Sequence, residues 1–129
     1  MAETDLATLI RAMNPRLKPG TFVFATVKTV PAAIDPLMTF RETEGITLIL
    51  PQAEAEAAGL PFTFAARMIT LEIHSSLNAV GFLAAISARL AEAGMAVNPV
   101  SGFYHDHLFV PEGRAEEAMA ILWEMASGS

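Results

Sequence analysis

Hydrophobic and polar side chains alternate most clearly in residues 68–74. Apolar side chains occupy every second position there, and the positions between them are Thr70, Glu72 and His74. Successive side chains of an extended chain point to opposite faces, so this pattern predicts a strand with one face in the core and the other in water.

The segment "SSLNAVGFLAAISARLAEAG", residues 75–94, has a helical spacing instead. Ser76 or Asn78 is a candidate N-cap, because a short polar side chain can accept a hydrogen bond from the first turn, and Gly94 is a candidate stop. The predicted buried stripe consists of Leu83, Ile86, Leu90 and Ala93. Together with the preceding strand it predicts one core that contains Ile69, Leu71, Ile73, Leu83, Ile86, Leu90 and Leu108.

Three further helices are predicted from spacing and end signals. The first follows Thr4 as N-cap and ends at Asn14 and Pro15. A short one lies between Pro51 and Gly59. The last begins near residues 111–112, and its apolar stripe consists of Ala115, Ala118, Met119, Leu122 and Met125.

The remaining apolar runs predict strands. They are "TFVFATVK" (residues 21–28), a hairpin of "LMTFR" and "ITLIL" around Gly45, residues 95–103 and residues 107–110. Pro99 cannot donate to a strand ladder, which places its strand at a sheet edge or a bulge.

The order of these elements predicts an α+β protein with antiparallel sheets. The second half reads β, α, β, β, α, a ferredoxin-like βαββαβ unit without its last strand, and the first half lacks an opening strand. We therefore expect two similar halves, residues 1–66 and 67–129, with possible strand exchange. In that case residues 21–28 or 62–66 complete a neighbouring sheet, since an unpaired edge would otherwise be exposed.

Composition limits the classes of function. The 129 residues contain eight Lys and Arg against fourteen Asp and Glu, for a net charge of −6 without a basic run. This argues against nucleic acid as a partner. The acidic, amphipathic start does not resemble a signal peptide, and no apolar run is long enough for a membrane span, so a cytoplasmic protein without a membrane partner is expected. A hydrophobic fraction of 53% and a mean hydropathy of +0.42 are high for a small monomer and predict a homodimer.

The stretch "GFYHDHLFV", residues 102–110, contains two of the three histidines. In a strand His105 and His107 share one face, while Asp106 points the other way. The pair could ligate a metal with His74 as a third ligand. Alternatively, "YHDH" is a hairpin corner in which Asp106 accepts backbone N–H bonds, or it is part of a ligand site.

Ser75 and Ser76 next to His74 raise the alternative of a nucleophile and a base. Neighbouring residues of a strand point apart and there is no nucleophile elbow, so helix capping accounts for the serines. No residue is predicted to be catalytic, and the chain is predicted not to be an enzyme.

The run "HSSLNAVGFLAAISARLAEAGMAVNPVSGFYHDHLFVPEGRAEEAMAIL" resembles the ACT domain, a small-molecule-sensing module attached to many enzymes of amino-acid biosynthesis. With "LMTFRETEGITLILP" and "GLPFTFAARMITLEIHSSL" included, nearly the whole chain resembles small bacterial tandem-ACT proteins without a catalytic domain, which are distantly similar to the ACT modules of aspartate kinases and of CASTOR-type arginine sensors. The resemblance implies a regulatory site for an effector, usually an amino acid, at an interface between ACT modules.

The loop that supplies this site in ACT domains is residues 74–81 here. The backbone N–H groups of Ala79, Val80 and Gly81, which are predicted to open the helix, also favour a carboxylate, and Gly81 allows a close approach. The sequence departs from the enzyme-linked pattern in having no acidic residue before Gly81, so Asp106 is the candidate partner for an α-ammonium. The predicted ligand-binding residues are His74, Ser75, Ser76, Asn78, Ala79, Val80 and Gly81 from the loop, and Tyr104, His105, Asp106 and His107 from the hairpin.

The prediction is thus a regulatory amino-acid-binding protein that uses no cofactor and whose regulated partner is undefined. The alternatives are an interaction module that kept the ACT fold without an effector, and a histidine-based metal-binding protein.

Overall fold

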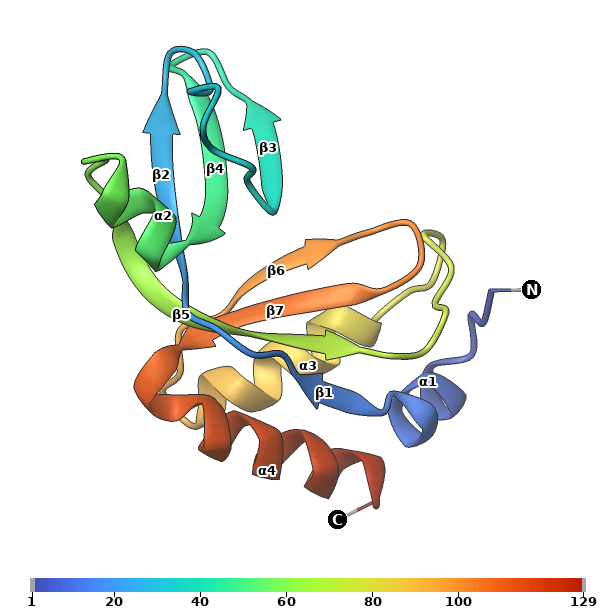
Figure 1. Cartoon of the computed structure of the whole chain (residues 1–129). Helices are drawn as coiled ribbons and strands as arrows, with labels where there is room; N and C mark the ends of the chain where they lie inside the picture. The colour runs from blue at the N-terminus through green and yellow to red at the C-terminus, as the bar shows by residue number, and fades with distance from the viewer. Residues whose placement is uncertain (1, 129) are drawn as a thin grey trace. The chain divides into compact units, whose positions relative to one another are not determined.

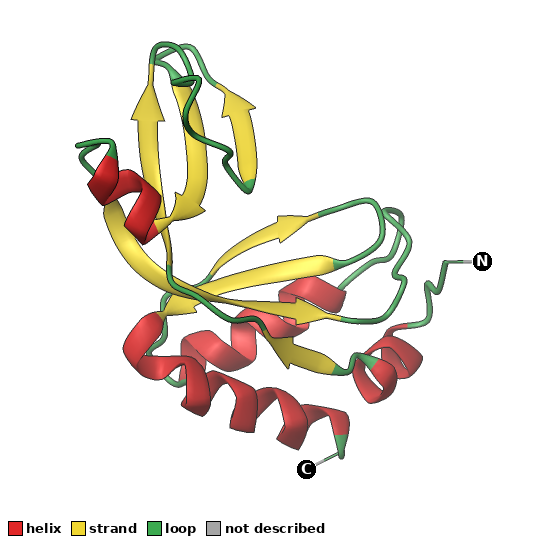
Figure 2. Cartoon of the chain, viewed as in Figure 1, coloured by secondary structure: helices red, strands yellow, loops and turns green. Residues whose placement is uncertain are grey.

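The computed structural model describes residues 2–128, which form two compact units (Figures 1 and 2). The larger unit combines the residues up to Pro19 with those from Arg67 onward, and the smaller unit is Gly20–Ala66. Each combines antiparallel strands with at least one α-helix, so the predicted α+β, ferredoxin-like fold is confirmed. The division at residues 66 and 67 stays a prediction about the sequence, because in space the first 19 residues pack with the second half.

The sheet of the larger unit has the strand order β1-β5-β7-β6. These strands are β1 (Pro15–Leu17), β5 (Thr63–Leu71), β7 (Asp106–Pro111) and β6 (Asn98–Ser101). The helical segments are α1 (Leu6–Ala12), α3 (Phe82–Glu92), the 3-10 turn η1 (Glu112–Arg114) and α4 (Ala115–Ala126). Figure 1 shows α3 and α4 on the same face of this sheet. Because β6 ends the strand order, the prediction that Pro99 belongs to an edge strand is confirmed.

One hydrophobic core joins that sheet face to the helices. Its fully buried members include Ile69 and Leu71 of β5, Ile86 and Leu90 of α3, and Leu108 of β7. Ile73 and Leu83 pack against it with part of their surface exposed. The predicted core is therefore confirmed, and Ala115, Ala118 and Leu122 add the buried stripe of α4.

The strand missing from the predicted βαββα pattern is β1. It pairs antiparallel with β5, with Arg16 opposite Thr70. The segment is only three residues long and contains Pro15 and a charged residue, so it has no alternating pattern to predict it.

The smaller unit contains β2 (Phe22–Val27), β3 (Met38–Arg41), β4 (Ile46–Pro51) and α2 (Gln52–Ala57). Antiparallel pairing in the order β3-β4-β2 brings β2 against the first residues of β5, where Phe22 lies opposite Ala66. Residues 63–66 thus complete this sheet, within the segment 62–66 that was one of the two predicted candidates. Its core consists of Val23, Ala25, Ile34, Leu48, Leu50 and Ala55.

Three local predictions were wrong. Asp5, not Thr4, caps α1, with its carboxylate accepting the Thr8 N–H at 3.0 Å. Neither Ser76 nor Asn78 caps α3, which begins at Phe82 after Gly81 as N-cap. The second face of β5 is not uniformly wet, because Thr70 is buried.

The burial of Thr70 has a polar reason. Its hydroxyl oxygen lies 3.0 Å from Nδ1 of His107 on the neighbouring strand β7, so its hydrogen-bonding capacity is used inside the structure.

None of the helices between residues 2 and 128 is both long and apolar enough to span a bilayer.

Candidate functional site

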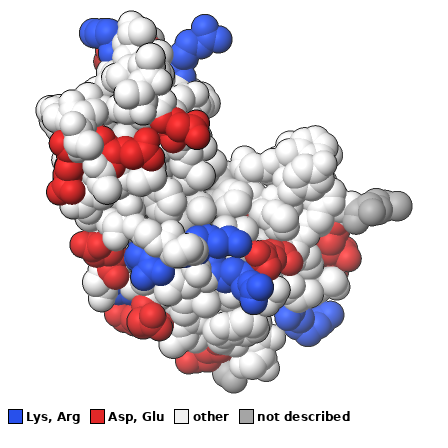
Figure 3. Space-filling view, viewed as in Figure 1, with Lys and Arg blue, Asp and Glu red and all other residues white. Residues whose placement is uncertain are grey.

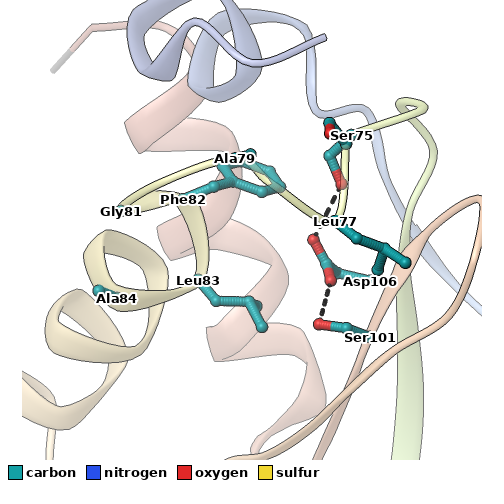
Figure 4. A pocket seen from close by; sticks show the side chains of 10 residues that line it. Ser75, Leu77, Ala79, Gly81, Phe82, Leu83, Ala84, Ser101 and Asp106 are labelled. Atoms are coloured by element: carbon teal, nitrogen blue, oxygen red, sulfur yellow. Dashed lines mark hydrogen bonds between the residues drawn. The ribbon is translucent and has the colours of Figure 1, made fainter. Parts of the chain in front are cut away.

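A cavity of about 170 Å³ lies in the larger unit, between the loop after β5, the start of α3 and the β6–β7 hairpin (Figure 4). An engineered cavity of about 150 Å³ holds a benzene molecule, so this one has room for a small molecule. The residues that line it are Ser75, Ser76, Leu77, Ala79, Gly81, Phe82, Leu83, Ala84, Ser101 and Asp106.

Asp106 is the one charged residue in that lining, and it is 7% exposed. Its Oδ1 accepts a hydrogen bond of 2.6 Å from the Ser101 hydroxyl, and its Oδ2 accepts one of 3.2 Å from the Ser75 hydroxyl (Figure 4). Among residues 2–128, no lysine, arginine or histidine forms an ion pair with it. A buried carboxylate held only by neutral donors retains the capacity to bind a cation.

The hairpin explanation predicted a different partner for Asp106. It was expected to accept backbone N–H bonds of the turn, and in the structure it accepts serine hydroxyls instead. The turn is closed by the backbone, where Gly102 N–H donates to the His105 carbonyl at 2.8 Å. The carboxylate is therefore directed toward the cavity rather than into its own turn (Figure 4).

The start of α3 forms the opposite part of the lining. The first intrahelical bond is donated by Ala85 N–H to the Gly81 carbonyl, and no side chain caps the helix. The preceding N–H groups of Phe82, Leu83 and Ala84 therefore have no intrahelical partner. Gly81 adopts a φ of +91°, a left-handed conformation that favours glycine and turns the chain into the helix.

The loop before this helix forms its own turn. The Ser76 hydroxyl accepts the Asn78 N–H at 3.0 Å, and the Ser76 carbonyl accepts the Ala79 N–H. The Ala79 N–H is therefore engaged. The N–H groups that open the helix belong to Phe82, Leu83 and Ala84, three residues further along than the predicted set of Ala79, Val80 and Gly81.

Some predicted site residues lie beside the cavity rather than in it. The ring of His74 packs against Tyr104 and Phe103, with centroids 5.3 and 6.3 Å away. His74 and Asn78 line a neighbouring hollow of about 240 Å³ together with Phe103. Val80 lines neither hollow and is 83% exposed.

His105 and His107 also lie outside the cavity lining. Their ring centroids lie 6.4 Å apart, which agrees with the predicted shared face, although His105 precedes β7. Burial, then the nearby His105, lowers the pKa of His107 below its usual value. Of the predicted residues, the structure thus brings Ser75, Ser76, Ala79, Gly81 and Asp106 together at the cavity, and it leaves His105 and His107 outside the lining.

No group of three or more histidine and acidic side chains in the described part of the chain is arranged to hold a metal ion.

The sequence did not indicate Ser101 or the residues that open α3. Ser101 lies opposite Asp106 in the β6–β7 ladder, so the hairpin register was the signal that could have found it. Gly81 was the signal for the helix start, because glycine is among the residues that occupy N-caps and adopts a left-handed conformation without steric cost.

Comparisons with known proteins agree with this architecture. Models of the ACT domain match residues 1–67 and residues 64–124. A Vibrio cholerae protein of unknown function, described as a possible transport protein, is 41% identical, with a TM-score of 0.85 over 94% of this chain and 95% of that one. No curated protein matches the sequence.

Two regulatory subunits of aspartate kinase share the fold at low identity. The Thermus flavus subunit is 10% identical, with a TM-score of 0.66 over 86% of this chain and 95% of that one. The Thermus thermophilus subunit, solved in a ligand-free form, is 10% identical, with a TM-score of 0.67 over 88% of this chain and 97% of that one.

Proposed function

Because this chain belongs to the ACT-domain family, with two ACT domains in tandem, we propose that it is a regulatory protein that binds a small amino acid in the Asp106 cavity. The observation that carries the proposal is the buried Asp106 carboxylate without a cationic partner among the described residues. A buried charge is costly unless it is paired, so an incoming ammonium group replaces the missing partner.

The start of α3 supplies the complementary half of a zwitterion site. The N–H groups of Phe82, Leu83 and Ala84 and the helix dipole favour a negative group at this end of an 11-residue helix. The amino acid places its carboxylate there and its ammonium on Asp106. Leu77 and Leu83 contribute apolar surface to the same cavity, and the volume favours a small side chain.

The catalytic alternative has little support. The Ser75 hydroxyl donates a hydrogen bond to a buried carboxylate, and the His74 ring packs at a tilt against the ring of Tyr104. We therefore propose that the chain acts by binding rather than by chemistry, without a cofactor and in the cytoplasm, and that it regulates another protein.

A homodimer is the second part of the proposal. Leu77, Val80, Phe103 and Tyr104 are all more than 60% exposed and are gathered on the loop and hairpin beside the cavity. The hairpin continues into β6, an edge strand of the sheet. A second copy that covers these side chains buries an apolar surface that a monomer leaves in water. Sedimentation of Phe103→Ser beside the unmodified protein tests it, and a monomeric unmodified protein contradicts it.

The ligand is tested by calorimetric titration with the twenty amino acids, one at a time. We expect at least one small amino acid to bind, and Asp106→Asn to weaken it by about 30-fold or more, because the amide cannot neutralise an ammonium group. Asp35→Asn serves as the matched control, since Asp35 is an exposed acidic residue of the smaller unit and takes no part in the cavity. Binding that is unchanged in Asp106→Asn, or no binding of any amino acid, contradicts the proposed site.

A further inference from the structure

Another concave surface lies at the opposite edge of the same sheet, and we name it the β1 groove. It has a volume of about 510 Å³ and is lined by Pro15–Lys18 of β1 and its flank together with Met119 and Trp123 of α4. Trp123 is 48% exposed, although large aromatic side chains usually bury most of their surface. None of these residues takes part in the Asp106 cavity.

The backbone of β1 leaves hydrogen-bonding groups open toward this groove. Lys18 N–H donates to the Met68 carbonyl and Glu72 N–H donates to the Asn14 carbonyl, which fixes the antiparallel register on both sides of Arg16. Backbone groups alternate in direction along a strand, so the N–H and carbonyl of Leu17 point away from β5. No residue in the described part of the chain bonds to them, because β1 is the outer strand.

Pro15 shapes the same edge. Its carbonyl points outward like that of Leu17, but a proline has no N–H to offer. The edge therefore presents one donor, the Leu17 N–H, and two acceptors, the carbonyls of Leu17 and Pro15. An added antiparallel strand centred on Leu17 accepts one hydrogen bond from Leu17, donates one to the Leu17 carbonyl and donates another to the Pro15 carbonyl.

The charge around the groove is basic, in contrast to the net −6 of the chain. Arg16 and Lys18 are both paired with the single carboxylate of Glu72, at 3.2 and 3.1 Å. Figure 3 shows Lys and Arg side chains gathered over the region of β1. Because the single Glu72 carboxylate neutralises only one of these two cations, a net positive charge remains at the groove, and it attracts an acidic partner.

We propose that the β1 groove binds an extended acidic peptide segment of a partner protein, which adds to the sheet as a strand beside β1. Its backbone pairs with Leu17, an apolar side chain lies against Trp123 and Met119, and its carboxylates face Arg16 and Lys18. The same charges disfavour a second copy at this edge: in an antiparallel self-pair centred on Leu17, Arg16 of one copy faces Lys18 of the other.

The probe is a capped, fluorescein-labelled peptide in which glutamate and valine alternate, and its binding is followed by anisotropy. Trp123→Ala and Arg16→Glu are expected to weaken it by about tenfold each. Arg41→Glu is the control, since Arg41 is an exposed cation of the smaller unit. Two peptides with N-methyl groups on alternate backbone amides extend this test. Binding is expected to be lost when the methylated amides are those that face β1, and to be retained when they are the amides that point away from it.

Amide exchange of the full chain, measured by NMR, gives the second readout. Leu17 N–H is expected to exchange fast in the free protein and slowly with the peptide bound, while Lys18 N–H is protected in both. Three results overturn the proposal. The first is no binding at about 1 mM peptide, and the second is equal affinity for a peptide in which lysine and valine alternate. The third is protection of Leu17 N–H that appears without peptide and increases with protein concentration. The last result assigns the edge to a second copy.

Discussion

The hydroxyl of Ser101 donates a 2.6 Å hydrogen bond to Oδ1 of Asp106, and the two residues face each other at the end of the β6–β7 ladder. The pair therefore closes a hairpin and holds the carboxylate of the candidate ligand site. This one hydrogen bond therefore positions the carboxylate that is proposed to bind the ligand.

Ser101→Ala removes this donor, so Oδ1 of the buried Asp106 carboxylate loses the hydrogen bond from residue 101. We expect a loss of about 1–3 kcal/mol in the free energy of unfolding, measured with urea. Ser101→Thr retains the hydroxyl and should stay close to the unmodified protein. If alanine and threonine variants are equally stable, the hydrogen bond does not contribute.

The local parts of the fold could be predicted because their signals are local. Residues 69–71 and the stripe of Ile86 and Leu90 show the strand and helix periods, and both bury the residues that those periods select. β1 has no such signal, since three residues that include Pro15 and Arg16 become a strand only through pairing with β5. That pairing depends on a partner about 50 residues away in the sequence.

The site was predicted in part for the same reason. The loop after β5 and Asp106 on β7 meet because β5 and β7 are neighbours in a ferredoxin-like sheet. The cap rule misplaced the helix start, because Ser76 uses its hydroxyl in a turn with Asn78 before the helix begins. Alternation along β7 puts His107 and Asp106 on opposite faces of the sheet. Only the face of Asp106 meets the cavity, so His107 lies outside its lining.

Leu90 tests the core of the larger unit. It is fully buried between α3 and the sheet, so Leu90→Ala is expected to cost about 2–5 kcal/mol in the free energy of unfolding, through lost burial and the cavity that remains. Leu77→Ala is the matched control: its side chain is 68% exposed, and a change within about 0.5 kcal/mol is expected. Similar losses in both variants would show that α3 does not pack as described.

Gly81 tests the turn into α3. At a φ of +91° an added Cβ meets only the Leu6 side chain at 3.5 Å, an ordinary contact, so the strain comes from the backbone. Gly81→Ala is expected to destabilise the protein by about 1–3 kcal/mol in thermal or urea unfolding.

Gly113→Ala provides the comparison. Gly113 has open space around its Cα and no left-handed φ, so alanine there is expected to be neutral or to stabilise by up to about 1 kcal/mol. Equal effects at both glycines would argue against a left-handed requirement at residue 81.

His107 makes stability depend on pH. Burial, with the nearby His105, lowers its pKa in the folded protein, so the folded state binds its proton less readily than the unfolded chain, whose value is near 6.5. A lowered histidine pKa therefore contributes to the stability of the folded state, and this contribution is complete at pH values above the pKa of the unfolded chain. The contribution is lost as the pH falls from about 6.5 toward the folded pKa, because the unfolded state then takes up the proton first.

We therefore expect the free energy of unfolding to fall between about pH 7.5 and pH 5.5, a range in which histidine is the side chain that titrates in the unfolded chain. His107→Gln should flatten this fall, since glutamine carries no charge and can still bond to the Thr70 hydroxyl, which lies 3.0 Å from Nδ1 of the histidine. His74→Gln serves as a control that leaves the Thr70 contact intact. Urea unfolding of the three proteins at both pH values measures the effect. An equally steep fall in His107→Gln would mean that the pH dependence arises elsewhere in the chain.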